Sequence, residues 1–122
     1  MILVDTSTWL DHFRGKRTQL DGLLGLQPRK LMHPFVFGEL LLNGLPKKGD
    51  QAKALRKLPS APVGSVAEVA AYIEWAKLTG TGVGYVDTHL LVSAKMLPGV
   101  CILTEDQRLQ AQAERLGLAY SG

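Results

Sequence analysis

Short apolar runs alternate along this chain with longer segments in which apolar residues recur every three or four positions. Runs of two to four such residues, flanked by Gly, Pro or acidic residues, are typical of buried strands. They occupy residues 2–4, 31–32, 61–63, 100–103 and 118–120. Helical spacing with Gly, Asn or Pro as stop signals predicts helices from residue 6 or 7 to Gly15, and over 18–26, 34–43, 47–58, 65–79, 86–96 and 105–116.

Strands that are apolar throughout and alternate with helices are typical of a parallel sheet covered on both faces. We therefore predict an α/β fold with three α/β/α layers and a short, mainly five-stranded parallel sheet. A chain of 122 residues has the size of one domain. Residues 1–122 are accordingly expected to form a single domain.

The apolar runs also exclude a membrane protein. None approaches the roughly 20 residues that a membrane-spanning helix needs. Asp5 interrupts the apolar N-terminus too early for a secretion signal. We therefore expect a cytoplasmic protein. Cys101 has no second cysteine to pair with, so an internal disulfide is excluded.

Two acidic residues stand where predicted strands end. Asp5 directly follows the first run, and Asp106 lies just beyond the run that ends at Leu103. The carboxyl ends of parallel strands meet at one edge of a sheet, and ligands bind beyond that edge. Topology alone thus places these two carboxylates close together. Glu105 is adjacent to Asp106 and could take its place.

Two further acidic residues interrupt apolar helix faces. Glu39 shares its face with Phe35, Val36 and Leu42, and Asp87 opens a helix whose following core-facing positions are apolar. Both side chains should therefore point inward. A buried carboxylate must be paired, protonated or bound to a metal. No Lys or Arg occupies a neighbouring core-facing position on either helix.

These observations predict a divalent cation held by Asp5, Glu39, Asp87 and Asp106. Oxygen ligands favour Mg²⁺, or Mn²⁺ in the same geometry. Each residue could instead have a structural role without a metal. An Asp at a strand-to-helix junction is often only a helix cap, and Glu39 could pair with a distant arginine.

Hydroxyl groups accompany the predicted ligands. Ser7 and Thr104 each lie two residues from an acidic residue, so they could hold waters or orient the carboxylates around the metal. The three histidines, His12, His33 and His89, lack the spacing of a zinc pair. We expect them at the surface or at helix ends.

Charge elsewhere on the chain is basic. The sequence has 14 Lys and Arg against 11 Asp and Glu, and four of the acidic residues are assigned to the site. The basic residues gather in two clusters: Arg14, Lys16 and Arg17, then Lys47, Lys48, Lys53, Arg56 and Lys57. Such clusters suit a polyanion, although a solvated helix face is the commoner reason for one charge run.

Taken in order, the segments ILVDTSTWLDHF, FGELLLNG, YVDTHLLVSA and LTEDQRL resemble the four acidic motifs of PIN-domain ribonucleases, especially VapC-type toxins of toxin–antitoxin pairs. The resemblance covers nearly the whole chain. Asp5, Glu39, Asp87 and Asp106 match the acidic quartet of the family, and Ser7 and Thr104 match its accompanying hydroxyls. The sequence departs mildly in having Thr88-His89-Leu90 after the third acid.

The resemblance implies a Mg²⁺- or Mn²⁺-dependent endoribonuclease with a five-stranded parallel sheet. It also implies a growth-inhibiting toxin that pairs as a homodimer and is obstructed by a VapB-like antitoxin. The substrate would be structured cellular RNA. Because an acidic pocket repels RNA, the basic clusters, above all Arg14, Lys16, Arg17, Lys47 and Lys48, are our candidates for phosphate contacts.

Three alternative functions remain at this stage. A receiver-like phosphoacceptor module has similar length and architecture, but it expects an acidic pair after the first strand, where Asp5 is instead followed by Thr6. A PIN-fold nuclease that matures RNA without an antitoxin shares every motif. A binding domain without catalysis is opposed by the intact quartet.

Overall fold

The structure is a computed structural model that describes residues 1–25 and 27–121. Within them, three parallel strands form one sheet in the order β2-β1-β3: β1 (Ile2–Val4), β2 (Lys30–Leu31) and β3 (Cys101–Leu103). The register places Leu3 beside Leu31 on one side and beside Ile102 on the other. The predicted α/β class with a parallel sheet is confirmed.

The five-stranded sheet predicted from the sequence is wrong. Neither outer run forms a strand. On one side a single bridge pairs Met32 with Ser60, the residue just before the run 61–63, and on the other a single bridge pairs Ile102 with Ala119. Beside β2 the Met32 N–H donates to the Pro59 carbonyl and the Ala61 N–H donates to the Met32 carbonyl. The ladder ends there because the next donor would be Pro34, which has no N–H and begins α2. The sheet therefore has a narrow centre of three strands, with one extra residue pair at each edge.

Helices connect the strands in the predicted order. Their bounds are α1 (Thr6–Phe13), η1, a 3₁₀ helix (Gln19–Leu23), α2 (Pro34–Leu42), α3 (Gly49–Arg56), α4 (Val66–Trp75), α5 (Tyr85–Met96) and α6 (Gln107–Arg115). Most are shorter than the hydrophobic pattern suggested. The helix predicted over 18–26 is the short η1, and residue 26 lies outside the described residues.

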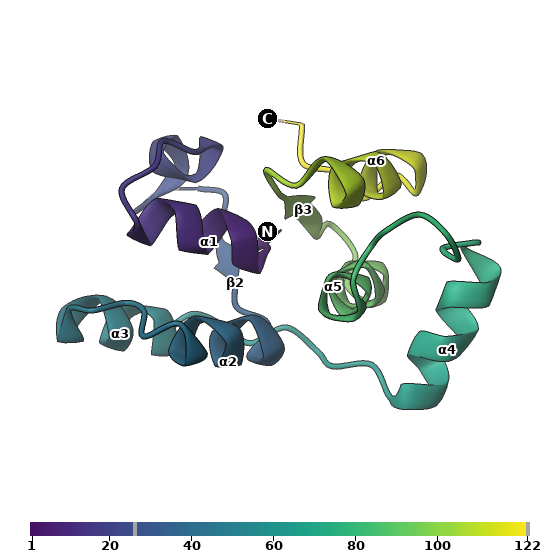
Figure 1. Cartoon of the computed structure of the whole chain (residues 1–122), viewed down its shortest axis with the longest axis horizontal. Helices are drawn as coiled ribbons and strands as arrows, with labels where there is room; N and C mark the ends of the chain where they lie inside the picture. The colour runs from purple at the N-terminus through teal and green to yellow at the C-terminus, as the bar shows by residue number, and fades with distance from the viewer. Residues whose placement is uncertain (26, 122) are drawn as a thin grey trace.

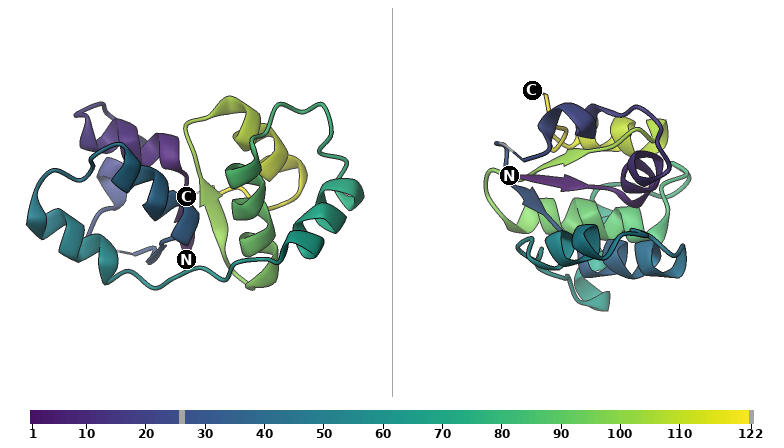
Figure 2. Two further views of the ribbon diagram at one scale, coloured as in Figure 1. Left: turned by 60° about the horizontal axis from the view of Figure 1, so that its bottom comes forward. Right: turned by 90° about the vertical axis from the view of Figure 1, so that its left-hand side faces the viewer.

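The helices lie on both sides of the sheet. Figure 1 shows β2 and β3 between α1 and α6 above and α2 and α5 below. The right panel of Figure 2 gives the same layering, with η1 and α6 on one side of the strands and α2 and α5 on the other. No described helix has both the length and the apolar character needed to cross a membrane.

The core lies where β1 passes through the centre of the molecule. Ile2, Leu3 and Val4 are at most 1% exposed, and Leu90 and Leu91 of α5 are fully buried beside them. Burial on both faces explains why β1 is apolar at every position instead of alternating. It also means that β1 ends abruptly at the buried Asp5, the first residue of the candidate site.

Candidate active site

Asp5 is a buried carboxylate held at the end of the central strand. Its side chain is the N-cap of α1, because Oδ1 accepts a 3.0 Å hydrogen bond from the Thr8 backbone N–H. The residue is only 1% exposed. The helix-cap alternative considered from the sequence is therefore correct for one oxygen of Asp5, but a cap alone leaves the second oxygen unexplained.

Two hydroxyls hold that second oxygen. Ser7 Oγ donates to Asp5 Oδ2 at 2.7 Å, and Thr104 Oγ1 donates to the same atom at 2.6 Å. Thr104 Oγ1 in turn accepts from the Asp106 backbone N–H at 2.9 Å. A carboxylate offers about four acceptor positions. The bonds from Ser7, from Thr104 and from the Thr8 N–H occupy three of them. Asp5 is thus fixed in orientation with one position left for a ligand.

Glu39 reaches the same place from α2. Its Oε1 accepts a 2.5 Å hydrogen bond from the Thr6 hydroxyl, at the first residue of α1. The side chain is half-buried, as its position on an apolar helix face predicted. The distant arginine considered as an alternative partner is not what holds it, since Thr6 makes the contact that orients it.

Asp106, and not Glu105, faces the other carboxylates. Asp106 caps α6, with Oδ1 accepting from the Arg108 and Leu109 backbone N–H groups at 2.9 and 3.0 Å. Glu105 is exposed, and its Oε1 accepts from the Gln19 backbone N–H at 2.8 Å, so it is directed toward η1. The ambiguity between these two neighbours is resolved by a contact with a residue far away in the chain.

All four predicted acidic residues line one pocket of about 390 Å³, together with Thr6, Ser7, Leu10, Gly84, Tyr85 and Val86. The pKa of Asp87 reflects the closeness of these carboxylates and their burial. Burial, followed by the charges of Asp5, Asp106 and Glu39, raises the pKa of Asp87 from 3.8 to about 7. Each cause disfavours an added negative charge. The pocket therefore concentrates negative charge that a cation would relieve.

The donor chemistry of the pocket fits a hard divalent cation. Every candidate ligand is a carboxylate or hydroxyl oxygen, the ligand type preferred by Mg²⁺ and Mn²⁺. Across residues 1–25 and 27–121, however, no three Asp, Glu, His or Cys side chains converge closely enough to hold a metal ion by themselves. An ion that retains several waters, as Mg²⁺ does, matches carboxylates that share a pocket without meeting at one point.

The predicted phosphate-binding residues lie outside the pocket. Arg14, Lys16, Arg17, Lys47 and Lys48 are all exposed. Arg14 Nη2 donates to Asn43 Oδ1 at 3.2 Å, which joins the end of α1 to the end of α2. The two basic segments follow these helix ends, so they begin on the same side of the molecule. Lys16 also lies 3.7 Å from Asp11.

Arg108 is a basic residue near the site that the sequence reasoning missed. Its side chain lies across Gly82, where an added Cβ would come within 2.9 Å of Arg108 Cδ. Gly82 also has φ +83°, which favours glycine. The glycine-rich segment before α5 thus allows an exposed arginine of α6 to lie against the loop that leads into α5, the helix that carries Asp87.

The histidines depart from expectation. His33 does cap a helix, since its Nδ1 accepts from the Phe35 N–H at 3.0 Å, but His33 and His89 are buried at 0% and 3% exposure. Their rings lie 5.8 Å apart. The prediction of a surface position is wrong for His89. The reason is tertiary, because α5 packs this face against the start of α2.

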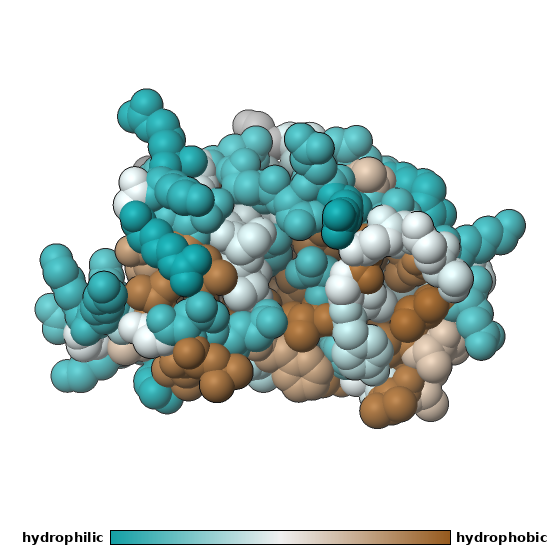
Figure 3. Space-filling model, viewed as in Figure 1, coloured by the Kyte–Doolittle hydropathy of each residue, from teal (hydrophilic) through white to brown (hydrophobic). Residues whose placement is uncertain are grey.

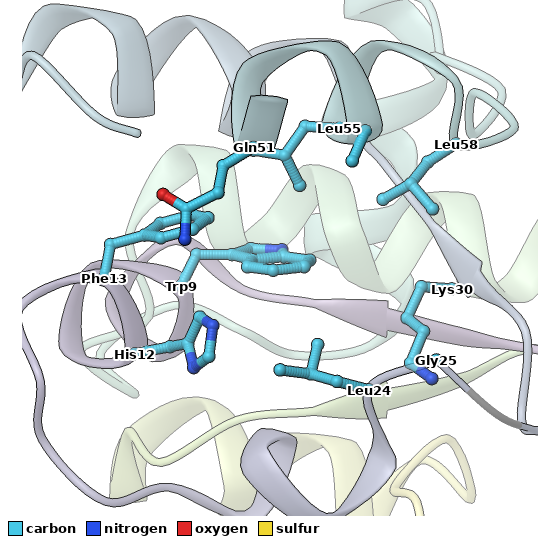
Figure 4. Close-up of a pocket in the computed structure, with 10 residues that line it drawn as sticks. Trp9, His12, Phe13, Leu24, Gly25, Lys30, Gln51, Leu55 and Leu58 are labelled. Atoms are coloured by element: carbon cyan, nitrogen blue, oxygen red, sulfur yellow. The ribbon is translucent and has the colours of Figure 1, made fainter. Parts of the chain in front are cut away.

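A second, mostly apolar cavity of about 300 Å³ lies between α1, α3 and the segment before β2. Figure 4 shows Trp9, Phe13, Leu55 and Leu58 around it, with Lys30 at its edge. None of the four carboxylates lines the apolar cavity, so its lining differs in chemistry from that of the acidic pocket.

The surface of the molecule is also uneven in polarity. Figure 3 shows hydrophilic side chains over α3 and apolar side chains below α2 and along α4.

Comparison with known proteins finds ribonucleases among the relatives of this chain. The chain is similar to Ribonuclease VapC32 of Mycobacterium tuberculosis, in strains CDC 1551 / Oshkosh and ATCC 25618 / H37Rv, with 36% identity over 121 residues in each case. The matched region is 99% of this chain and 97% of each relative. No family model matches the chain. The similarity therefore extends over nearly every element described above.

Proposed function

Since this chain belongs to the VapC family of ribonucleases, we propose that it is a metal-dependent endoribonuclease and the toxin of a toxin–antitoxin pair. The observation that carries the proposal is the pocket that Asp5, Glu39, Asp87 and Asp106 line together. Burial, followed by the charges of the other three carboxylates, raises the pKa of Asp87. A cation would relieve this accumulation of negative charge, and hydrolysis of a phosphodiester is chemistry that a cation serves.

In this proposal Mg²⁺, or Mn²⁺, would be held in the pocket by the four carboxylates together with waters that the ion retains. When bound, the ion would lower the pKa of a coordinated water and stabilise negative charge on the phosphoryl oxygens. The protein supplies the geometry. Ser7 and Thr104 hold Asp5 in one orientation through Oδ2, and Thr6 holds Glu39. Preorganised carboxylates need no rearrangement when the substrate arrives.

Asp87 is our candidate for proton transfer. A carboxyl group whose pKa is raised to about 7 can accept a proton near neutral pH, as a general base must. It lies in the pocket with the other three acids and is partly buried. A bound cation would lower this pKa. Whether Asp87 accepts a proton or binds the metal therefore depends on whether the cation is present.

Attraction of RNA is assigned to the basic surface. The acidic pocket repels a polyanion, whereas the exposed Arg14, Lys16, Arg17, Lys47 and Lys48 attract it and release counterions. Arg108 joins them, because it follows the ligand Asp106 by two residues and lies against Gly82. RNA would therefore bind along these basic residues and present one phosphodiester to the acidic pocket.

The family also suggests partners and a setting. We propose that a VapB-like antitoxin obstructs the enzyme, that the protein pairs as a homodimer, and that it acts in the cytoplasm on cellular RNA. The whole chain, residues 1–122, would form one nuclease domain. A PIN-fold nuclease that matures RNA without an antitoxin remains the alternative within the same fold.

The nuclease proposal is tested with the purified chain and a radiolabelled RNA. Cleavage should require added Mg²⁺ or Mn²⁺ and stop in EDTA. Asp5→Asn should remove cleavage while far-UV circular dichroism stays unchanged. Asp11→Asn is the matched control, since Asp11 also lies on α1 but outside the pocket, and it should cut normally. Full cleavage in EDTA would end the metal mechanism.

The toxin proposal needs a cellular test. Expression of the chain alone should slow growth, the Asp5→Asn chain should not, and co-expression of the small antitoxin protein should restore growth. If cells that contain soluble, RNA-cutting protein grow normally, the toxin role is lost. The nuclease role would survive that result, and the RNA-maturation alternative would replace the toxin.

A further inference from the structure

Two exposed aromatic rings flank a buried histidine at the edge of the acidic pocket. Tyr85, the first residue of α5, lines the pocket beside Asp87 and is 53% exposed. Phe35 lies on α2 one turn before Glu39 and is 40% exposed. Both rings contact His89, with centroids 4.9 Å from Tyr85 and 4.7 Å from Phe35.

His89 packs against these two rings from the interior of the protein. It is 3% exposed, and its Nδ1 has no hydrogen-bond partner within the described part of the chain. Both neighbours meet it edge to face, at 84° for Tyr85 and 71° for Phe35, a favourable aromatic geometry. The buried His89 ring thus packs against both exposed rings.

Rings that are rigid, exposed and adjacent to a phosphodiester-cleaving pocket suit an unpaired nucleobase. Aromatic side chains stack on bases of single-stranded RNA, and such contacts tolerate any base because each has a π-face. We propose that Tyr85 and Phe35 form a stacking subsite for a nucleobase next to the bond that is cut. This inference rests on the proposed nuclease function and adds a substrate contact to it.

Charge argues against the rival occupant, a second copy of this chain. An isologous contact centred on these rings would place the same residues of both copies together. Tyr85 adjoins Asp87, and Phe35 is one turn from Glu39, so two acidic pockets would also approach each other. Like charges brought together across an interface oppose association. RNA carries its negative charge on phosphates and offers an uncharged base to the rings.

Binding is measured with a single-stranded RNA that carries 2-aminopurine and cleavage-resistant phosphorothioate linkages. Tyr85→Ala should raise the RNA Kd by about 5- to 150-fold, the range for loss of one base–aromatic stack, and should remove the quenching of 2-aminopurine. Tyr85→Trp should retain both. Trp75→Ala is the control, since Trp75 is 66% exposed on α4 outside the acidic pocket, and it should bind RNA unchanged.

An abasic RNA separates stacking from charge. Removal of the bases should make the unaltered chain and Tyr85→Ala bind equally. If the two proteins still differ by the same factor on abasic RNA, or do not differ on normal RNA, the subsite is overturned. If Tyr85→Ala and Phe35→Ala change the sedimentation mass but not RNA affinity, the rings form a contact between copies and the subsite is also overturned.

The experiment distinguishes this inference from the function on which it rests. Normal RNA binding and cutting by Tyr85→Ala, together with loss of cutting in Asp5→Asn, removes the subsite and leaves the nuclease. Failure of the unaltered chain to bind or cut RNA removes both. Mn²⁺ affinity, followed by electron paramagnetic resonance, should be equal in Tyr85→Ala and the unaltered chain, because the ring is assigned to the base and not to the metal.

Discussion

The Thr6 hydroxyl donates a 2.5 Å hydrogen bond to Glu39 Oε1. This contact joins the first residue of α1 to the middle of α2, across 33 positions of the chain. Glu39 comes from the middle of α2, whereas Asp87 lies in the first turn of α5. A strand end fixes Asp5 and a helix cap fixes Asp106, whereas Glu39 depends on Thr6 for its orientation.

Thr6→Val should therefore weaken the site without unfolding it. Valine has the shape of threonine but cannot donate to Glu39, and loss of a partner that orients a ligand costs about 10- to 100-fold in metal affinity. We expect this loss in Mn²⁺ titrations followed by electron paramagnetic resonance. Thr6→Ser should keep the affinity, and Thr79→Val, at an exposed position, should not change it. Equal Mn²⁺ affinity in Thr6→Val and the unaltered chain would contradict a positioning role.

Asp87 should make stability fall as pH rises when divalent cations are absent. Its folded pKa of about 7 lies above its ordinary value of 3.8, so the folded state binds more protons between these values. The penalty is absent below about pH 4 and complete above pH 7. Solvent screening of this partly exposed group reduces it to about 2 kcal/mol. Chemical unfolding in EDTA at pH 5 and 8 measures it as the amount by which Asp87→Asn changes the difference in unfolding free energy between the two pH values, because the slope of the buried His33 is present in both chains.

Divalent cations give a second test of the same group. Mg²⁺ should raise the melting temperature more at pH 8 than at pH 5, because the ionised pocket gains more from a cation. The Asp87→Asn chain should gain less than the unaltered chain at pH 8. An equal gain at both pH values would show that Mg²⁺ stabilises the protein elsewhere.

His33 should act in the opposite direction. Burial, and then the neighbouring His89, lowers the pKa of His33 from 6.5 to about 4. The unfolded state therefore binds more protons between these values, and stability is lost as pH falls from 6.5 toward 4. The full effect is about 3 kcal/mol. His33→Asn keeps an acceptor for the Phe35 N–H but does not titrate, so its unfolding free energy should lose this slope.

The slopes of Asp87 and His33 overlap in the same acidic range and partly cancel. The unaltered chain is thus expected to show a flat pH profile between about pH 4 and 6.5, and each variant should reveal the contribution of the other group. A profile of Asp87→Asn that falls toward acid, beside a profile of His33→Asn that rises toward acid, is the expected pair of results.

The basic segments should govern the salt dependence of RNA binding. Each phosphate contact to single-stranded RNA contributes about 0.7 to the slope of log affinity against log salt. Lys47→Gln with Lys48→Gln should weaken binding and lower the slope by up to about 1.4. Lys77→Gln with Lys95→Gln, which removes two exposed lysines outside the basic clusters, serves as a charge-matched control. An unchanged slope in the double variant would exclude these lysines from the RNA path.

Several parts of the site could be predicted because they follow from local rules. The strand that ends at Asp5 is apolar throughout, and its parallel neighbour ends just before Asp106, so the two carboxylates had to share an edge. The capping box of Ser65 and Glu68 is equally local, because its two residues stand three positions apart in the chain, and both of its hydrogen bonds form. Whether the four carboxylates bind metal and catalyse stays a prediction.

Other parts depended on contacts between distant residues. Glu105 and Asp106 are equivalent in the sequence, and only the bond from Gln19 to Glu105 separates them. The bridges at Ser60 and Ala119 are too short to be strands, which no apolar run could reveal. Phe35 lies on α2, and Tyr85 and His89 lie on α5. The hydrophobic periodicity of the sequence does not specify how these two helices pack against each other.

The sequence by itself determined the alternation of strands and helices, the edge of the sheet that carries Asp5 and Asp106, and the inward faces of Glu39 and Asp87. Hydrophobic period and helix capping act over a few residues, so these features are written locally. The tertiary structure alone decided which hydroxyl holds each carboxylate, which acid of a neighbouring pair enters the pocket, and which rings stand at its edge. Those outcomes depend on how helices distant in sequence pack together, because a hydrogen bond or ring contact needs atoms within a few ångströms.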